Sequence, residues 1–455
     1  ISPRTNCGTV QLGDSGDTIT IPAGATITNN GTQNGFGRTG TVNWETTVKT
    51  SGFTAASGEG YFVDTSSGAI SVNLPAGTAG AIVAFKDYGN TFDTNPVTLV
   101  QNGSDKIGGS TVNGLLQTEG IAVTLVFIDS TKGWLVTNSG LQDEAPTAEY
   151  ISATGGTVTT VDTNFKVHTF TGPGTFCVSA VGNPAGSDKV SYMVVAGGAG
   201  SGGDSGGGGG AGGFREGKVT SDPYTASPLV STGFQCGSGG IPVAVAAYPV
   251  TVGAGGSAGT AAAPSGSPTP GGDGNPSTFA GTTSITSAGG GGGGSRPAPD
   301  GRPGGSGGGA RSTAGNAGSG NTPPVAPAQG FDGGGASPTP TGNAAGGGGA
   351  TALGVYNSTP TASAGGPGGA GATTSINGSP TAFAGGGGGG GGGSPPANGG
   401  TGGAGGGANG APGGASTPGN NGTANTGGGS GGGNDDANGG SGGSGIVIIR
   451  YKFQG

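Results

Sequence analysis

The sequence predicts an all-β chain with little or no α-helix, built as a modular, elongated fibre around a glycine-rich bundle. Three observations lead to this fold class. Residues 196–445 are roughly one-third glycine, a content that no helix tolerates. Residues 41–140 contain short β-branched and aromatic runs separated by turn residues. The glycine stretch is followed by residues 446–453, a strongly apolar run that needs a strand partner.

The composition argues against several classes of function. The net charge is −8, only 8% of the residues are charged, and no basic cluster occurs, which argues against nucleic-acid binding. No apolar run reaches membrane-spanning length, and the N-terminus has no signal-peptide core. Since the first residue is Ile1 rather than Met, we expect a chain that was processed or lacks its true start.

The three cysteines, Cys7, Cys177 and Cys236, are too few and too widely spaced for a disulfide framework or a zinc signature. We expect reduced thiols, and the alternative is a bridge between Cys177 and Cys236. Asp14 and Asp17 bracket a turn and are expected to be solvated rather than to bind calcium. The sequence therefore predicts no metal site and no cofactor.

Residues 1–40 are predicted to form a β-stalk or attachment segment. Alternating residues between 8 and 29 favour strands, but Ile19, Ile21 and Ile27 are too few to form a core in one chain. Copies from several chains would have to wrap together.

Residues 41–145 are predicted to form a β-sandwich or a trimeric β-prism-like module. The strand-like runs recur at a spacing of about ten residues, which is typical of such folds. The clearest hairpin joins residues 123–129 to residues 134–137. A polar segment with a proline, residues 141–149, then marks a boundary.

Residues 146–195 and 446–455 are predicted to form a β frame that encloses residues 196–445. Residues 190–195 and 446–453 are apolar at successive positions, so both faces of these strands are expected to be buried in the middle of one sheet. Pairing them would hold the glycine region as a loop closed at both ends.

The enclosed region is predicted to be a bundle of polyglycine-II-type helices. Such helices have three residues per turn, rise about 3.1 Å per residue and make no internal hydrogen bonds. Neighbouring rods can instead bond to each other through their backbones, which satisfies the buried N–H and C=O groups. Residues 276–288 and 372–384 are read as small hairpins between rods. The alternative is a disordered linker.

No catalytic site is predicted, so we expect a protein that is not an enzyme. The single histidine, His168, lies in an expected strand, where a structural role is the simpler interpretation. Gly212 to Lys218 nearly matches a phosphate-binding loop, but Val219 stands where a magnesium-binding hydroxyl is needed.

The candidate binding residues are isolated side chains in the glycine region. Exposed aromatic rings stack on sugars or enter apolar pockets, and arginines bind anionic groups. The alternatives are aromatic rings that fill gaps between the rods and the frame, and solvated loop arginines. The candidates are Tyr224, Phe234, Phe331, Tyr356, Arg296 and Arg302, with Tyr248 and Arg311 as further possibilities.

An ordered series of short segments resembles glycine-rich tail fibre proteins of marine bacteriophages, such as cyanophages. The segments span residues 44–50, 60–64, 133–138, 168–176, 194–198, 248–253 and 445–453. The architecture is also similar to that of T-even-type distal adhesins. The resemblance implies an extracellular virion tail fibre, a homotrimer joined through the stalk, that contacts other tail or baseplate proteins. It further implies attachment to a bacterial surface receptor, a glycan or an outer-membrane protein.

Two other functions fit parts of the sequence. A purely structural subunit of an extracellular or environmental filament would also use a rigid glycine bundle. A glycan-cleaving depolymerase would need a pair of carboxylates around a pocket, for which the sequence shows no pattern.

Overall fold

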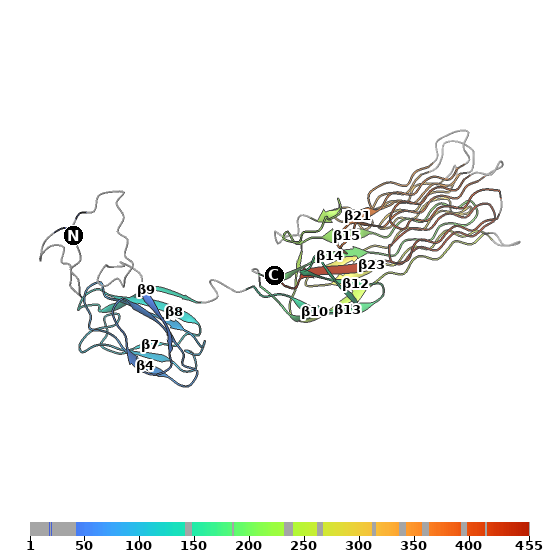
Figure 1. Ribbon diagram of the computed structural model, residues 1–455. Helices are drawn as coiled ribbons and strands as arrows, with labels where there is room; N and C mark the ends of the chain where they lie inside the picture. Colours follow the sequence, from blue (N-terminus) through green and yellow to red (C-terminus); the bar gives the residue numbers. More distant parts are fainter. Residues whose placement is uncertain are drawn as a thin grey trace, which may run out of the picture. The chain divides into compact units, whose positions relative to one another are not determined.

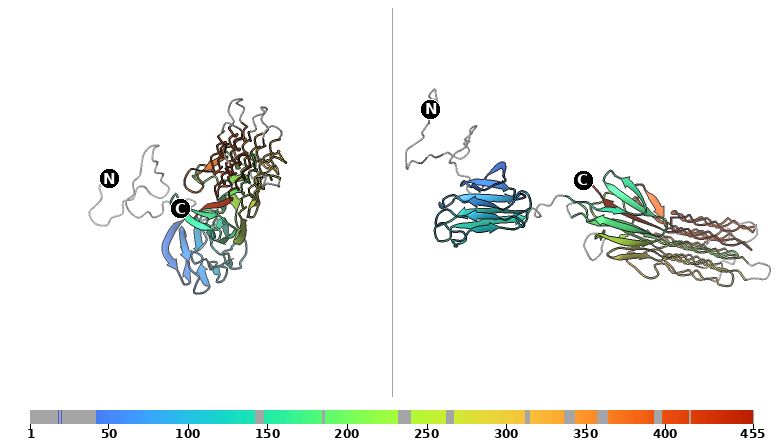
Figure 2. Two further views of the ribbon diagram at one scale, coloured as in Figure 1. Left: turned by 90° about the vertical axis from the view of Figure 1, so that its right-hand side faces the viewer. Right: turned by 90° about the horizontal axis from the view of Figure 1, so that it is seen from below.

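The computed structural model describes residues 18, 20, 42–141, 148–183, 186–231, 240–261, 267–311, 315–335, 343–356, 364–392, 398–414 and 416–454. The chain divides between Pro146 and Thr147 into two compact units (Figures 1 and 2). Every regular element among the described residues is a β-strand, which confirms the predicted all-β class. The predicted β-stalk lies almost entirely outside the described residues.

The N-terminal unit contains two sheets. The first has the order β1-β3-β5-β8-β9, and its strands span Asn43–Lys49, Glu59–Val63, Ile82–Asp87, Ile121–Phe127 and Trp134–Leu141. The second has the order β2-β4-β6-β7, with strands Phe53–Thr54, Ile70–Asn73, Val97–Val100 and Gly114–Leu116.

Successive strands of this unit alternate between the two sheets from β1 to β6. Strands that neighbour each other within a sheet are therefore parallel, as in β1-β3-β5 and β2-β4-β6. Only the last strands pair antiparallel, including the predicted β8-β9 hairpin. The spacing of the strand-like runs indicated a β module but not its strand order, because pairing between strands distant in the sequence leaves no local signal.

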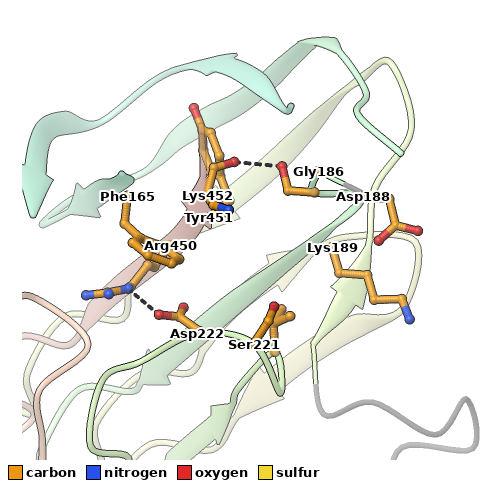
Figure 3. A pocket seen from close by; sticks show the side chains of 11 residues that line it. Phe165, Gly186, Asp188, Lys189, Ser221, Asp222, Arg450, Tyr451 and Lys452 are labelled. Atoms are coloured by element: carbon orange, nitrogen blue, oxygen red, sulfur yellow. Dashed lines mark hydrogen bonds and ion pairs between the residues drawn. The ribbon is translucent and has the colours of Figure 1, made fainter. Parts of the chain in front are cut away.

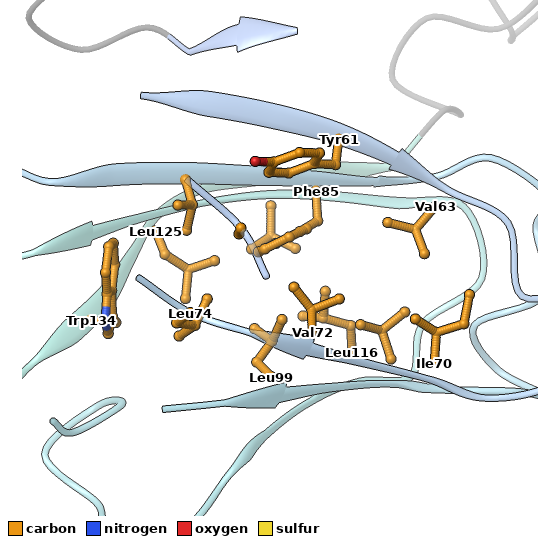
Figure 4. Close-up of a cluster of buried hydrophobic side chains, with 14 of the residues drawn as sticks. Tyr61, Val63, Ile70, Val72, Leu74, Phe85, Leu99, Leu116, Leu125 and Trp134 are labelled. Carbon is orange, nitrogen blue, oxygen red and sulfur yellow. The ribbon is translucent and has the colours of Figure 1, made fainter. Parts of the chain in front are cut away.

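A single apolar core lies between the two sheets (Figure 4). In β4 the side chains alternate between buried and exposed, as expected for a strand with one face on the core. Phe85, Leu125 and Trp134 are among the largest fully buried side chains. Burying such rings and aliphatic chains is the main source of stability in this unit.

The main sheet of the C-terminal unit has the order β11-β12-β23-β14-β15-β16, with β17 also paired to β14. The strands span Thr157–Val161, Phe165–Phe170, Ile446–Lys452, Lys189–Val195, Phe214–Gly217, Val230–Ser231 and, for β17, Ile241–Pro242. The predicted central placement of β14 and β23 is confirmed, and they pair antiparallel. Along β14, Tyr192 and Val194 belong to one apolar cluster and Met193 and Val195 to another, so both faces are buried.

A second sheet, β10-β13-β18-β19-β20, covers one of these faces. Its strands span Ser152–Thr154, Gly174–Ala180, Ala246–Thr251, Ser277–Ala280 and Ser284–Ser287. The β19-β20 pair is the first predicted hairpin of the glycine region. The second is β21-β22, Ala372–Thr374 and Thr381–Phe383, which packs Ile376 and Phe383 against the other face.

Between β14 and β23 the chain runs repeatedly away from the sheets and back as extended segments, which we call rods (Figures 1 and 2). The rods are joined by backbone hydrogen bonds between segments far apart in the sequence. Gly209 donates to the carbonyl of Ser430 at 2.9 Å, and Gly387 donates to the carbonyl of Gly209 at 2.9 Å. The described rods thus form a bonded bundle rather than the alternative disordered linker.

The hydrogen-bond partners along a rod recur every three residues. Gly197, Gly200 and Gly203 donate to Asn275, Gly272 and Thr269, whereas Gly198, Ser201 and Asp204 donate to Gly443, Gly440 and Ala437. The residues between them, Ala199 and Gly202, donate to Gly210 and Gly207. A helix with three residues per turn requires this period of three neighbours. Polyglycine-II dihedral angles themselves stay a prediction.

The rods lie too close together for side chains to separate them. A Cβ atom added to Gly209 would lie 2.2 Å from the carbonyl oxygen of Ala199, and one added to Gly387 would lie 1.9 Å from that of Ser430. Both distances are far below van der Waals contact. Glycine is needed at these positions because backbone packs directly on backbone.

Candidate functional site at the turns of the rods

The first pair of rods reverses direction at Asp204 and Ser205. Both residues have positive φ angles, 58° and 54°, a conformation that is uncommon outside glycine. Asp204 follows Val195, the last residue of β14, by nine residues, which corresponds to roughly 28 Å of chain at about 3.1 Å per residue. Non-glycine residues held in this conformation mark a turn that the surrounding contacts determine strongly.

Charged side chains from four segments meet at this turn. The Arg296 Nε lies 2.6 Å from the Asp204 Oδ2, and an Arg296 Nη donates to the Asp204 Oδ1 at 3.1 Å. Arg311 donates from its Nε to the Asp204 backbone carbonyl at 3.1 Å. The Ser205 hydroxyl donates to a carboxylate oxygen of Asp435. We call these five residues the distal cluster.

The distal cluster is buried at its centre and exposed at its rim. The Asp204 side chain is fully buried, whereas that of Arg296 is 60% exposed. One hydrogen bond and one close ion-pair contact join Arg296 to the buried carboxylate and restrict the orientation of its guanidinium group. Burial lowers the pKa of Arg311, an effect that the nearby Arg296 adds to and that Asp204 and Asp435 oppose. The arrangement therefore presents an oriented cation to solvent.

The other predicted arginine, Arg302, lies outside this cluster. Its guanidinium is 3.4 Å from the carboxylate of Asp273, and both side chains are about half exposed. Its backbone bonds to Gly292 within the rods rather than at a turn. Exposed pairs of this kind contribute little stability.

Two of the predicted aromatic residues lie on neighbouring rods. Phe331 is 37% exposed and Tyr356 is half-buried. Their rods are joined by the hydrogen bond from Gly354 to the carbonyl of Asp332, 2.9 Å long. Phe234 lies outside the described residues.

The prediction that Tyr224 is a surface aromatic is corrected by the structure. Only 5% of the residue is exposed, and its ring lies beneath two cations, with Lys218 Nζ at 5.3 Å and the Arg450 guanidinium carbon at 5.1 Å from the ring centroid. Burial raises the pKa of its hydroxyl. Tyr224 thus takes the alternative role, filling the interior beside the frame.

Sequence reasoning missed the environment of Arg450 on β23. This side chain is fully buried, with Nε 2.8 Å from the Asp222 carboxylate and Nη2 2.6 Å from that of Asp162. Figure 3 shows the contact with Asp222 and the ring of Phe165 beside the guanidinium. The available signal was one arginine directly after four apolar residues of the same strand.

This network ties the last strand to two distant segments. Burial raises the pKa of Asp222, while Arg450 and the hydrogen bond from the Ser191 hydroxyl, 2.9 Å long, act in the opposite direction. The adjacent hollow has a volume of only about 60 Å³ (Figure 3). The network is therefore best understood as an internal fastening of the frame.

His168 lies in the interior of the frame, in agreement with the structural role that its place in an expected strand suggested. It is fully buried on β12, its Nδ1 lies 2.7 Å from the carbonyl of Gly155, and its Nε2 lies 3.2 Å from the hydroxyl of Tyr451. Burial lowers its pKa.

The described residues offer no metal-binding cluster and no membrane-spanning helix. They contain no cluster of three or more metal-ligating His, Cys, Asp or Glu side chains, and no helix long and apolar enough to cross a membrane. Cys177 is half-buried with a free thiol among the described residues, whereas Cys7 and Cys236 lie outside them.

The fold and the distal cluster define a scaffold protein, in which glycine rods carry polar turns. The chain belongs to the glycine-rich domain family, whose model matches residues 170–452. Residues 9–142 match a second model, described as Bacteriophage T4 gp9/10-like protein, N-terminal.

A curated relative gives a shorter match. The baseplate wedge protein gp10 of Enterobacteria phage T4 is 40% identical over 74 residues, which cover 15% of this chain and 12% of that protein. The chain therefore spans only a small part of this relative. Together the matches support a structural protein of the phage tail or baseplate type, a component of the virion.

Proposed function

We propose that the protein is a tail fibre protein of a marine bacteriophage that attaches the virion to a receptor on the bacterial surface. The receptor is a glycan or an outer-membrane protein, and the turns of the rods make the contact. The observation that carries the proposal is the distal cluster, where a half-exposed Arg296 is held on a fully buried Asp204. The resemblance of the ordered series of segments to glycine-rich fibres of marine phages is the ground for proposing this kind of virus.

The scaffold supports this role physically. Binding residues are most effective when rigid elements hold them, and loops on such elements can vary without loss of the fold. The rods are fixed to one another by backbone hydrogen bonds, so their packing does not depend on the exposed side chains at their turns. We further infer that the rods are polyglycine-II helices, since their bonding partners recur every three residues.

The N-terminal unit is proposed to join the protein to the rest of the tail. The match of residues 9–142 to the gp9/10-like N-terminal model supports contacts with other tail or baseplate proteins. A homotrimer joined through the N-terminal segment belongs to the same proposal. Sedimentation analysis of the full chain tests the trimer, and a stable monomer at micromolar concentration argues against it.

Competition with intact phage tests the receptor-binding role. The purified full chain is expected to reduce phage adsorption to host cells, and Arg296→Ala is expected to weaken this competition at least about tenfold, because it removes the oriented cation. Arg302→Ala is the matched control, since that arginine forms an exposed pair away from the turn. Absence of competition by the unaltered chain would overturn the proposal, and open-ended polymers of the chain in electron micrographs would favour the filament instead.

A further inference from the structure

A cavity of about 250 Å³ lies in the C-terminal unit at the end of the frame opposite to the rods. The last rod leads into β23 at its first residue, Ile446. The cavity is lined by Tyr451 and Phe453, at the other end of this strand. Tyr150, Ser152, Val158 and Lys166 complete most of its wall. We call this the proximal pocket, and the distal cluster plays no part in it.

The wall of the proximal pocket combines aromatic rings with one cation. The Lys166 Nζ lies 4.5 Å from the centroid of the Phe453 ring and donates to the Thr160 hydroxyl at 2.8 Å. The Lys452 Nζ lies 5.5 Å from the centroid of the Tyr150 ring. Cations over ring faces hold both partners in place. Among the described residues that line the pocket, Lys166 is the one charged side chain.

The hydroxyl of Tyr451 is fixed from behind by His168. A carbonyl oxygen only accepts hydrogen bonds, so the His168 Nδ1 donates to Gly155 and carries the ring proton. The Nε2 of the neutral ring is then an acceptor, and the Tyr451 hydroxyl donates to it. Burial raises the pKa of Tyr451 to about 12, so the hydroxyl keeps its proton. The pocket is therefore organised before any ligand enters.

We propose that the proximal pocket binds one acidic monosaccharide unit, a pyranose ring that carries a carboxylate. The volume is slightly below the roughly 300–1,000 Å³ of pockets for larger ligands, which suits a single sugar ring. Aromatic rings pack on the apolar C–H face of a pyranose. The Lys166 ammonium pairs with the carboxylate. Val158, 45% exposed on the edge strand β11, forms the accessible rim.

Titration of the full chain with glucuronate tests the proposal, with glucose and acetate as comparison ligands in calorimetry or NMR. Glucuronate is expected to bind, and glucose and acetate to bind at least about tenfold more weakly, because each offers only half of the contacts. Equal binding of all three ligands, or no binding of glucuronate at tens of millimolar, would overturn it.

Two variants locate the site. Lys166→Met removes the cation. Val158→Asp places a negative charge, which repels the carboxylate of the ligand, on the exposed rim of the pocket and leaves the core unchanged. Each is expected to weaken glucuronate binding at least about tenfold, whereas Lys132→Met, an exposed lysine of the N-terminal unit, leaves it unchanged. Binding that survives both variants would show that the ligand sits elsewhere and would refute the proposal. Competition of the purified chain with phage adsorption, which tests the distal cluster, is a separate measurement and does not depend on this result.

Discussion

The N-terminal unit and the glycine rods of the C-terminal unit reach rigidity in opposite ways. In the N-terminal unit, two sheets enclose large side chains such as Phe85 and Trp134, and backbone groups form hydrogen bonds between neighbouring strands. In the rods, backbone bonds to backbone in three directions and side chains are nearly absent. The comparison shows that dense packing does not require an apolar core, provided that glycine lets the chains approach closely enough.

The N-terminal core and the rods also differ in the substitutions that they tolerate. A side chain in the N-terminal core is constrained by its volume, so the damage from a substitution scales with the cavity that it leaves. A closely packed rod position, such as Gly209, has no room even for a Cβ atom, so any substitution of the glycine disturbs the packing. The chemical variety that the rods exclude is therefore found at their turns, as in the distal cluster.

The largest expected effect is on the side-chain core. Phe85→Ala is expected to lower the free energy of unfolding of the N-terminal unit by about 3–5 kcal/mol, because it removes a fully buried ring. Scanning calorimetry of the full chain should show one transition shifted and that of the C-terminal unit unchanged. Val136→Ala, at an exposed position, is the control and should change stability by less than about 0.5 kcal/mol.

A smaller loss of stability is expected when a single carbon atom is added to a rod. Gly209→Ala adds only one carbon, yet this atom would lie 2.2 Å from a carbonyl oxygen, so we expect a loss of about 1–3 kcal/mol from the C-terminal unit. Gly335→Ala is the matched control, because its Cβ would meet no atom closer than 3.8 Å. If thermal unfolding showed the same stability for both variants, the proposed contrast between the backbone-packed rods and the side-chain core would be wrong.

The smallest effect concerns pH. Burial lowers the folded-state pKa of His168, so the unfolded chain takes up a proton first as the pH falls. The stability from neutral His168 is present above the ordinary value of 6.5 and is lost as the pH falls below it. Because His168 is the one histidine of the sequence, this loss between pH 7 and about pH 5 falls on the C-terminal unit alone.

The variant His168→Gln isolates this contribution from that of Asp222, whose raised pKa acts in the opposite direction. The difference in melting temperature between the variant and the unaltered chain should narrow as the pH is lowered. A difference that stays constant across this range would mean that His168 does not titrate differently in the folded state.

Much of the frame could be predicted from local patterns. The apolar runs at β14 and β23 indicated central strands, and Asn377 with Gly378 indicated the turn of β21-β22. The exchange of strands between the two N-terminal sheets was not predictable, since parallel pairing of β1 with β3 carries no turn signal.

Contacts between distant residues were also beyond sequence reasoning. Arg450 and Asp162 are 288 positions apart, and Arg296 and Asp204 are 92 apart. The sequence gives no signal that would pair these residues across such separations. Only the course of the rods, set by the backbone bonding, brings Arg296 to the turn at Asp204.

Amide hydrogen exchange in the rods tests the central claim most directly. The account predicts that amides of residues 206–213 and 385–391 are protected as strongly as those of Lys189–Val195 in β14, because each donates a hydrogen bond to the backbone of a neighbouring segment. Exchange at the rate of an unstructured chain in these glycine segments, with β14 still protected, would contradict a scaffold made of laterally bonded backbone.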